Sequence, residues 1–287
     1  MSGDIPIIDT HQHLIYPEKH RYSWTAGIPQ LAGKAFRYDD YLKAIEGTGI
    51  TGAVFMESGA DDPQWQEETR FVHALAGTPG SLIKGIISSC RPEQESGFEA
   101  YVESVLSPRL VGFRRILHVE PDELSQRPTF AANVRLLEKY DLTFDLCVLA
   151  RQMPLATALA GKCPGVQFIL DHCGVPDIVS GQLDPWRRHI REIASLPNVA
   201  CKISGVIAYC AAGHATLEAV RPHVEHCLEQ FGWDRVVWGS DWPVCTTTAD
   251  LRGWVGVTRQ LVGRADEGDQ RKLLHDNATQ IYGVDEP

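Results

Sequence analysis

Short apolar runs alternate along the whole chain with stretches whose apolar residues recur at helical spacing. The runs predict strands over Ile5–Asp9, Ile50–Glu57, Leu82–Ser89, Leu110–Leu117, Leu142–Val148, Val166–Asp171, Asn198–Ser204 and Arg235–Ser240. The other stretches predict helices near Asp39–Gly47, Pro63–Leu75, Gln94–Leu106, Thr129–Lys139, Pro154–Ala160, Pro185–Leu196, His214–Phe231, Ala249–Val262 and Gly268–Ile281. Glycine and proline punctuate many of these ends, as expected where one element gives way to the next.

Regular alternation of strand and helix predicts an α/β fold, a single (β/α)8 TIM barrel that occupies residues 1–287 as one domain. The last predicted segment, Gly268–Ile281, is an extra C-terminal helix. A doubly wound open sheet is the alternative, but it usually has fewer strands and a glycine-rich first turn. Gly47–Gly52 does spell GxGxxG, yet it precedes a strand instead of following one, so the context of a dinucleotide site is missing.

The connection from Leu14 to Tyr38 has no clear element of its own. It carries the aromatic residues Tyr16, Tyr22, Trp24, Phe36 and Tyr38. Loops of this length inside a compact domain are usually functional or disordered, and aromatic content argues against disorder. Because this loop follows the first strand, we expect it to cover the mouth of the barrel.

Composition excludes several classes of function. The net charge is −10 and the pI about 5.5, which argues against nucleic acid or an anionic membrane as a partner. No run of apolar residues is long enough to span a bilayer. The eight cysteines form no CxxC pair, and the N-terminus offers no room for a secretion signal, so we expect a reducing, cytoplasmic location.

Polar residues stand where the predicted strands end, and in a barrel these ends converge on one site. The candidates are His11, His13, Glu57, Ser88, Arg114, Arg115, Asp145, Asp171, His172, Lys202, Ser204 and Asp241. His11 and His13 are two apart on a strand and therefore point to the same side, where imidazoles can hold a metal, polarise a carbonyl or orient water. Alternation allows only one of Arg114 and Arg115 to face inward.

Each candidate also has a purely structural interpretation. The histidine pair could lie on the surface, and the acids could cap helices or pair with core arginines. A single residue such as His172 is more often a hydrogen-bonded core histidine, so the convergence of the set carries the argument. Elsewhere, the HxxH of His223 and His226 falls on an amphipathic helix, and we interpret it as part of a solvated face. No GxSxG elbow, P-loop or HExxH is present.

Four motifs, in order, resemble those of one superfamily: DTHQHL from Asp9, ILDHCG from Ile169, KISG from Lys202 and WGSDWP from Trp238. They are similar to the amidohydrolase superfamily, and within it to the branch of TIM-barrel lactonases that includes sugar-lactone, pyrone dicarboxylate and sulfomuconolactone hydrolases. The sugar lactonases of the L-fuconolactonase and L-rhamnonolactonase type are the most similar. The resemblance covers essentially the whole chain.

The resemblance implies a hydrolase that opens a sugar-derived (aldono-) lactone, with water activated by Asp241 and histidine or arginine side chains stabilising the oxyanion. We expect His11, His13 and His172 to act with Asp241 in catalysis. Substrate-binding roles are expected for Glu57, Arg114, Lys202, Trp24, Trp242 and Asp145. The partner would be a small-molecule lactone, and a homo-oligomer is compatible with the sequence. The alternatives are a metal-dependent decarboxylase or other reaction of the superfamily and, behind it, a non-catalytic sugar-binding barrel.

The same residues bear on whether the protein binds a metal. Metal-rich members of the superfamily use a lysine on the fourth strand and a histidine on the fifth, whereas this chain offers Arg114 and Asp145 there. We therefore expect no binuclear centre and no required cofactor. A single zinc ion on His11, His13 and Asp241 is the alternative, since three nitrogen or oxygen ligands suffice.

Overall fold

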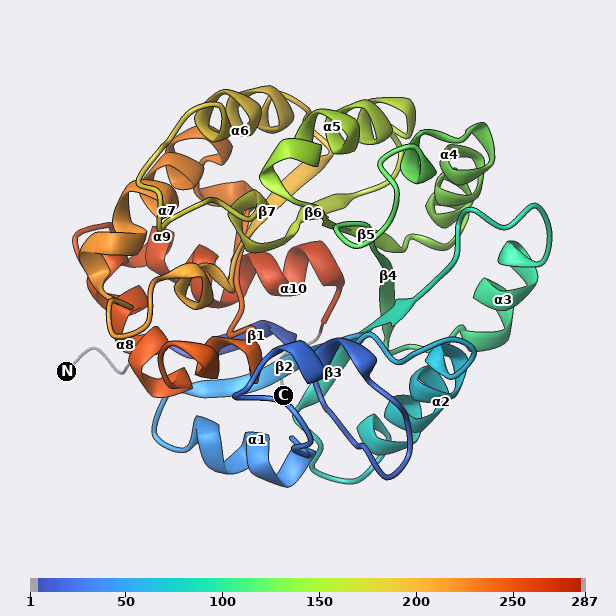
Figure 1. The fold of residues 1–287 in the computed structure, drawn as a ribbon, viewed down its shortest axis with the longest axis horizontal. Helices are drawn as coiled ribbons and strands as arrows, with labels where there is room; N and C mark the ends of the chain where they lie inside the picture. Colours follow the sequence, from blue (N-terminus) through green and yellow to red (C-terminus); the bar gives the residue numbers. More distant parts are fainter. Residues whose placement is uncertain (1–4, 285–287) are drawn as a thin grey trace.

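The structure, a computed structural model, describes residues 5–284 and confirms the predicted barrel (Figure 1). Parallel strands follow one another around it in sequence order. They are β1 (Ile7–Gln12), β2 (Ile50–Met56), β3 (Ile83–Ser89), β4 (Leu110–Ile116), β5 (Thr143–Cys147), β6 (Phe168–Leu170), β7 (Val199–Ile203) and β8 (Val236–Trp238). The residues after β8 complete the ring, because the His13 backbone N–H donates to the Trp242 carbonyl over 2.7 Å and the Asp241 N–H donates to the His11 carbonyl over 2.7 Å.

Helices surround the strands on the outside (Figure 1). They are α1 (Tyr38–Ile45), α2 (Trp65–Ala76), α3 (Phe98–Val105), α4 (Pro128–Arg135), α5 (Met153–Lys162), α6 (Trp186–Ala194), α7 (Leu217–Phe231) and α8 (Leu251–Val262). The predicted last helix, Gly268–Ile281, is present as one continuous helical stretch made of α9 (Glu267–Arg271), a π-helical turn (Lys272–Asp276) and α10 (Asn277–Tyr282). The Asn277 amide donates to the carbonyls of Trp233 and Val236, which fixes the start of α10 beside β8.

The apolar core has an outer layer between strands and helices and a smaller cluster inside the barrel. Strand residues of the inner cluster include Ile8, Val54, Met56, Ile87, Ile169, Ala200 and Val237. Ala278, Tyr282 and Val284, from α10 and the residues after it, pack against them. Figure 1 shows α10 within the ring of helices. The C-terminal segment therefore closes the barrel at the end opposite the polar strand ends.

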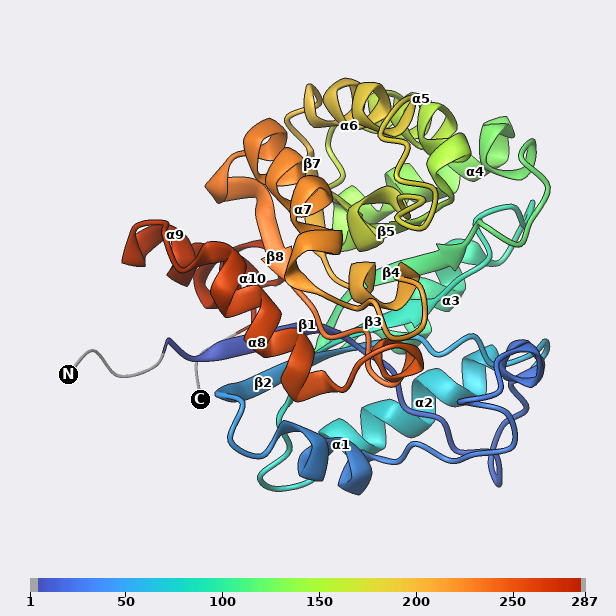
Figure 2. The ribbon, with the colours of Figure 1, turned by 60° about the vertical axis from the view of Figure 1, so that its left-hand side comes forward.

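The long first loop is ordered against the rest of the barrel. It contains a short 3-10 helix (Ser23–Gly27) and an isolated bridge between Ile15 and Phe36. The Arg21 N–H donates to Gln64 at the start of α2 over 2.8 Å, which places the loop beside that helix (Figure 2). The Trp24 indole N–H donates to the Ser58 carbonyl over 2.9 Å. These contacts place the loop at the C-terminal ends of β1 and β2.

Helix α7 packs against α6 along the side that carries His223 and His226. His223 and His226 on α7 are buried against Trp186 of α6, so the solvated-face interpretation of the HxxH is wrong. The reason is that α7 turns this side toward α6, not toward solvent. All eight cysteines are free and buried, in keeping with the absence of a disulfide framework. Within residues 5–284, no helix combines the length and apolar character needed to cross a bilayer.

Candidate active site

A cavity of about 400 Å³ opens at the C-terminal ends of the strands. Of the sequence-predicted residues, it is lined by His13, Trp24, Glu57, Arg114, Arg115, His172 and Asp241. Its wall also includes Ile28, Ile116, Val119 and Val244, which give it an apolar side. His11 is fully buried and contacts His13 and His172 at the floor. A mostly apolar cavity with a few convergent polar groups is the usual form of a small-molecule site.

Two of the lining residues adopt backbone conformations that L-residues seldom use. His172 has φ of 55° and Asp241 has φ of 57°. Each follows the last residues of a short strand, β6 or β8, where the chain turns sharply instead of extending. Non-glycine residues in the left-handed region cost about 1–3 kcal/mol and are concentrated at functional sites. The turns aim both side chains back over the end of the barrel.

The hydrogen bonds of His13 define which ring nitrogen carries its proton. Nδ1 lies 3.0 Å from the Met56 carbonyl oxygen and 3.0 Å from that of Glu57, and carbonyls can only accept. Nδ1 is therefore the protonated atom. Nε2 faces Nε2 of His11 at 3.2 Å and Oδ1 of Asp241 at 3.4 Å.

His11 presents a second acceptor to the same point. Burial holds the pKa of His11 well below its usual value, against the opposing charge of Asp171, so the ring is neutral. Its Nδ1 lies 3.4 Å from Oδ1 of Asp171 and its Nε2 3.7 Å from Oδ1 of Asp241. With the proton on Nδ1 toward Asp171, three acceptor atoms converge, from His11, His13 and Asp241. Such a group requires a proton or a cation among its members.

The spacing of these three atoms fits a single metal ion. The distances between them are 3.2, 3.4 and 3.7 Å, whereas ligand atoms of a tetrahedral zinc site lie about 3.3 Å apart. His172 has a ring nitrogen within 4.8 Å of ligand atoms of His11 and Asp241. The donor set predicted from the sequence is thus brought together. Asp145, which stands where metal-rich relatives carry a histidine, is not part of it.

Arg114 is the cation that already lies beside this group. Nη1 lies 3.2 Å from Nε2 of His11 and 3.3 Å from Oδ2 of Asp171. Nε donates to Oε1 of Glu57 and Nη2 to the Glu57 carbonyl, both over 2.8 Å. Burial alone would lower the pKa of Arg114, but Glu57 foremost among its neighbours raises it. Arg115 points the other way, to Glu93 and Glu120 at 2.9 Å each.

Lys202 and Asp145 form a buried layer beneath the site. Lys202 Nζ lies 2.5 Å from Oδ1 of Asp145 and 3.1 Å from Oδ1 of Asp171. Burial raises the pKa of Asp145 to about 7. The Tyr282 hydroxyl of α10 donates to the same carboxylate over 3.2 Å. Both Lys202 and Asp145 are completely buried and neither lines the cavity, so the structure does not place them against a substrate.

Trp242 also lies outside the cavity. It is 4% exposed, and the centroid of its ring lies 5.6 Å from that of Phe36 and 5.4 Å from that of Tyr41. Because Asp241 turns the chain, the next side chain points into the helical layer.

Several lining residues escaped the analysis of the sequence. Tyr209 follows β7 in a 3-10 turn (Val206–Tyr209), and His118 follows β4. Burial, reinforced by Arg114, lowers the pKa of His118 to about 4. Gly205 lies between β7 and the 3-10 turn that carries Tyr209. A methyl group at Gly205 would be 2.4 Å from Nδ1 of His172 and 2.7 Å from Oδ2 of Asp241. Only the KISG motif, which contains Gly205, offered a signal for any of them.

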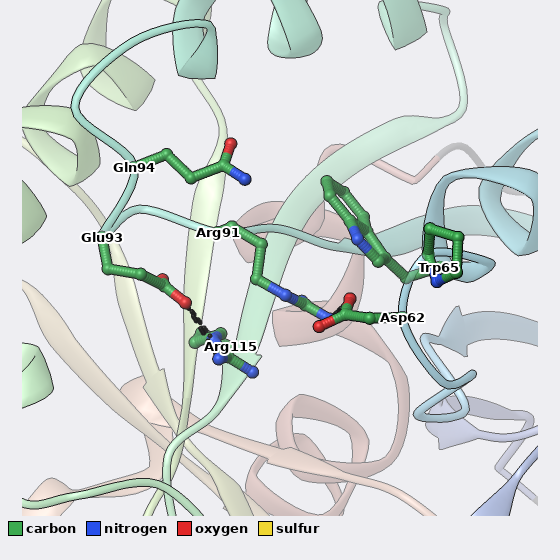
Figure 3. Close-up of a pocket in the computed structure, with 7 residues that line it drawn as sticks. Asp62, Trp65, Arg91, Glu93, Gln94 and Arg115 are labelled. Carbon is green, nitrogen blue, oxygen red and sulfur yellow. Dashed lines mark hydrogen bonds and ion pairs between the residues drawn. The ribbon is translucent and has the colours of Figure 1, made fainter.

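A second, more open pocket adjoins the cavity at the rim (Figure 3). Arg91 and Arg115 line both of them. Figure 3 shows Arg91 extending toward Asp62 and Trp65. Its Nη2 lies 2.8 Å from Oδ1 of Asp62, and its guanidinium carbon lies 4.7 Å from the centroid of the Trp65 indole. Each rim arginine is thus paired with an acid.

The strand ends of this (β/α)8 barrel bring a carboxylate, imidazoles and an arginine into one cavity. Enzymes with this fold place their catalytic groups at the same end of the barrel. The sequence profile of the family described as Amidohydrolase matches residues 8–284. The chain belongs to the amidohydrolase family.

Two named lactonases and one solved structure resemble it over nearly their whole length. An L-fucono-1,5-lactonase of Burkholderia ambifaria is 27% identical, covering 98% of this chain and 96% of that protein. An L-rhamnono-gamma-lactonase of Scheffersomyces stipitis is 24% identical, over 97% and 98%. The crystal structure of an amidohydrolase from Burkholderia multivorans with bound zinc has a TM-score of 0.88 at 25% identity and covers 98% of this chain and all of that one, 100%.

Proposed function

We propose that the protein is a lactonase that opens a sugar-derived lactone, of the L-fuconolactone type, to the aldonic acid. The observation that carries the proposal is the position of Asp241, whose Oδ1 lies within 3.4 Å of His13 Nε2 at the floor of the cavity that Arg114 also lines. A carboxylate there can take a proton from water while neighbouring donors receive a developing oxyanion. The lactonase names of two relatives support the same reaction class.

In the proposed reaction, Asp241 accepts a proton from a water molecule whose oxygen attacks the lactone carbonyl carbon. The carbonyl π pair moves to its oxygen, which accepts hydrogen bonds in the tetrahedral intermediate. The intermediate then collapses, the ring C–O bond breaks, and the leaving alkoxide takes the proton from Asp241. One water is consumed and one hydroxy acid is formed.

Arg114 and His172 are suited to donate to the oxyanion because both line the cavity. Nη2 of Arg114 makes one hydrogen bond among the described residues, to Glu57, which leaves its second hydrogen for a ligand. Nδ1 of His172 lies 2.9 Å from the Ser204 hydroxyl, which fixes the ring and leaves Nε2 for the substrate. Trp24, whose indole N–H donates to the Ser58 carbonyl, lines the same cavity.

Residues placed beneath the cavity would act through their neighbours. Lys202 contacts Asp171, and Asp171 contacts both His11 and Arg114. We therefore assign Lys202, Asp145 and Asp171 to positioning of the arginine and the imidazole. Glu57 has the same role from the other side, since it holds two edges of the Arg114 guanidinium.

His11, His13 and Asp241 would hold a zinc ion, which when bound supplies a Lewis acid or a more acidic water. A lactone is an activated ester and needs less of this help than an amide. The positive charge that the three acceptors require is available from this chain in Arg114, whose Nη1 lies 3.2 Å from Nε2 of His11. We propose that no cofactor is required.

The test is a panel of aldonolactones assayed with a pH indicator, with and without chelator, beside the Asp241→Asn variant. Acid release by the wild type and its loss in the variant would support the proposal. A wild type that binds aldonolactones without turnover would contradict it and favour a binding barrel. Release of CO2 from aromatic or unsaturated carboxylic acids, without lactone opening, would favour the decarboxylase alternative.

A further inference from the structure

Three buried cysteines meet behind the candidate active site. Cys173 follows His172, Cys201 lies on β7 and Cys227 on α7, and their Sγ atoms all lie within 4.8 Å of one another. A single buried cysteine usually packs as a small hydrophobic residue. Here three separate elements direct a thiol to one point, which packing alone does not require.

A buried imidazole accompanies the thiols. His223 precedes Cys227 by four residues on α7, so both side chains lie on the same face of the helix. His223 is 3% exposed, and neither Nδ1 nor Nε2 has a side-chain hydrogen-bond partner among the described residues. Its one polar contact is with the backbone of Ala219, in the preceding turn of α7. At least one ring nitrogen therefore lacks a partner, which costs about 1–3 kcal/mol for a buried polar group.

We propose that Cys173, Cys201 and Cys227 bind one thiophilic cation, Zn²⁺, with His223 as the fourth ligand. Three thiolates and an imidazole form a known structural zinc set, in which Zn–S bonds of about 2.3 Å place the sulfurs about 3.8 Å apart. The three sulfurs, grouped within 4.8 Å, need only small adjustments of side chains to reach that spacing. His223 lies outside this group in the structure, so its ring would have to turn toward the sulfurs to become the fourth ligand. Binding releases the thiol protons and adds its free energy to folding.

The position of the cluster gives the ion a structural task. Cys173 has φ of 54°, next to His172 with φ of 55°, so its thiol belongs to the strained turn that presents the histidine. The Trp186 indole N–H donates to the Cys173 carbonyl over 2.8 Å and ties the same turn to α6. A cation would join this turn to β7 and α7. It would thereby hold His172 in place without touching the substrate.

The thiolate site differs chemically from the group at the cavity floor. His11, His13 and Asp241 offer only nitrogen and oxygen atoms, whereas the buried cluster offers sulfur. Cobalt(II) bound to thiolates absorbs in the near ultraviolet by sulfur-to-metal charge transfer, and cobalt on histidine and carboxylate does not. Cobalt spectra therefore distinguish the two sites, and the result does not depend on whether the enzyme is a lactonase.

The experiment refolds the full chain under reducing conditions with Zn²⁺, with Co²⁺ or with chelator, because the cluster is closed to solvent once folded. We expect one equivalent of tightly held metal, a charge-transfer band with Co²⁺, and a melting temperature raised by roughly 5 °C or more over the chelator sample. Cys227→Ala should lose the band and the shift. His223→Ala should keep the band with an altered visible spectrum.

Cys163→Ala is the matched control, since Cys163 is a buried free thiol that bonds to the Ala131 carbonyl and lies outside the cluster. It should keep the band and the shift. If Cys227→Ala does not fold, the cobalt-refolded wild type still decides, because its charge-transfer band reports sulfur ligands directly. A wild type that holds no metal, or metal without a charge-transfer band, would overturn the proposal, as would a band that survives in Cys227→Ala.

Discussion

Gly205 lies against His172 so closely that a methyl group on the glycine would be 2.4 Å from Nδ1 of the imidazole. The same methyl group would be 2.7 Å from Oδ2 of Asp241. Gly205 also has φ of 61°, which disfavours any side chain. We expect Gly205→Ala to lower kcat at least tenfold, because both site residues must move, and to destabilise the fold by roughly 1–2 kcal/mol.

Gly213→Ala is the control, because it has the backbone strain of Gly205→Ala without its close contacts. Gly213 has φ of 76°, and a methyl group there would meet no atom within 4 Å. Its cost in urea unfolding should match the backbone part of the Gly205→Ala effect, with kcat unchanged. If the two variants have the same kcat, the close approach of Gly205 has no part in catalysis.

Asp241→Asn should lower kcat by roughly 10²–10⁴-fold, the usual contribution of a positioned base. Asparagine is isosteric and tolerates the left-handed backbone of this position, φ 57°, so the melting temperature should change little. Steady-state kinetics and thermal unfolding measure the two effects. Turnover near that of the wild type in a folded variant would remove Asp241 from the mechanism.

The alternation of strands and helices was enough to predict the barrel and the order of its elements. The C-terminal helix was predicted to within one residue at each end, although apolar spacing did not indicate the π-helical turn at Lys272–Asp276 inside it. His223 was misplaced, since an amphipathic pattern does not say how much of a helix a neighbour such as α6 covers.

At the site, alternation correctly limited the inward-facing arginine to one of Arg114 and Arg115, and the structure shows that it is Arg114. It could not place Trp242, because the left-handed turn at Asp241 interrupts the strand and redirects the next side chain. Alternation did not predict the position of Lys202 either. It gives the side of the strand to which a side chain points but not how deep in the barrel that side chain lies. Lys202 lies beneath the cavity, where it contacts Asp145 and Asp171.

Arg114→Met should raise KM, lower kcat, or both, and it should also destabilise the protein by about 3–5 kcal/mol because Glu57 and Asp171 lose a buried partner. Arg114→Lys should rescue only part of the activity, since lysine lacks the planar fork that spans Glu57 and His11. Arg115→Met is the control at the neighbouring position. Kinetic damage from the Arg115 variant alone would contradict the assigned roles.

Glu68 on α2 makes stability depend on pH. Burial, with the Glu57 carboxylate next in size, raises its pKa to about 8 from 4.5. Between these values the folded state holds a proton that the unfolded chain releases, so the free energy of unfolding falls as pH rises through this window. We expect Glu68 to contribute a loss of roughly 2–4 kcal/mol between pH 5 and 8, measured by urea unfolding.

Glu68→Gln should flatten this part of the profile, because the amide stays neutral and can still accept from the Ser58 N–H. Glu67→Gln, on the exposed side of the same helix, should leave the slope unchanged. Equal slopes in the wild type and in Glu68→Gln would show that Glu68 titrates at an ordinary pKa.

Either of two cations can balance the acceptors at the cavity floor, a bound zinc ion or the Arg114 guanidinium. The triangle of His11, His13 and Asp241 fits zinc, yet Arg114 already lies 3.2 Å from His11 and can balance the same acceptors. We therefore expect the folded enzyme to keep more than half of its kcat/KM after dialysis against chelator. Because His13 and Asp241 line the cavity, an ion bound there can be removed in the folded state, whereas the cysteine cluster is closed to solvent.

The metal content should be followed in the same samples by elemental analysis and by the cobalt charge-transfer band. Metal held by the thiolates would remain without affecting the interpretation, and activity should not follow the removable fraction. Arg114→Lys, tested in parallel, should gain more from added zinc than the wild type does, because lysine keeps the charge but lacks the planar fork that places it beside both Glu57 and His11. Activity lost on chelation and restored in proportion to zinc bound at the histidines would show that Arg114 does not replace the ion and would favour the metal-dependent alternatives.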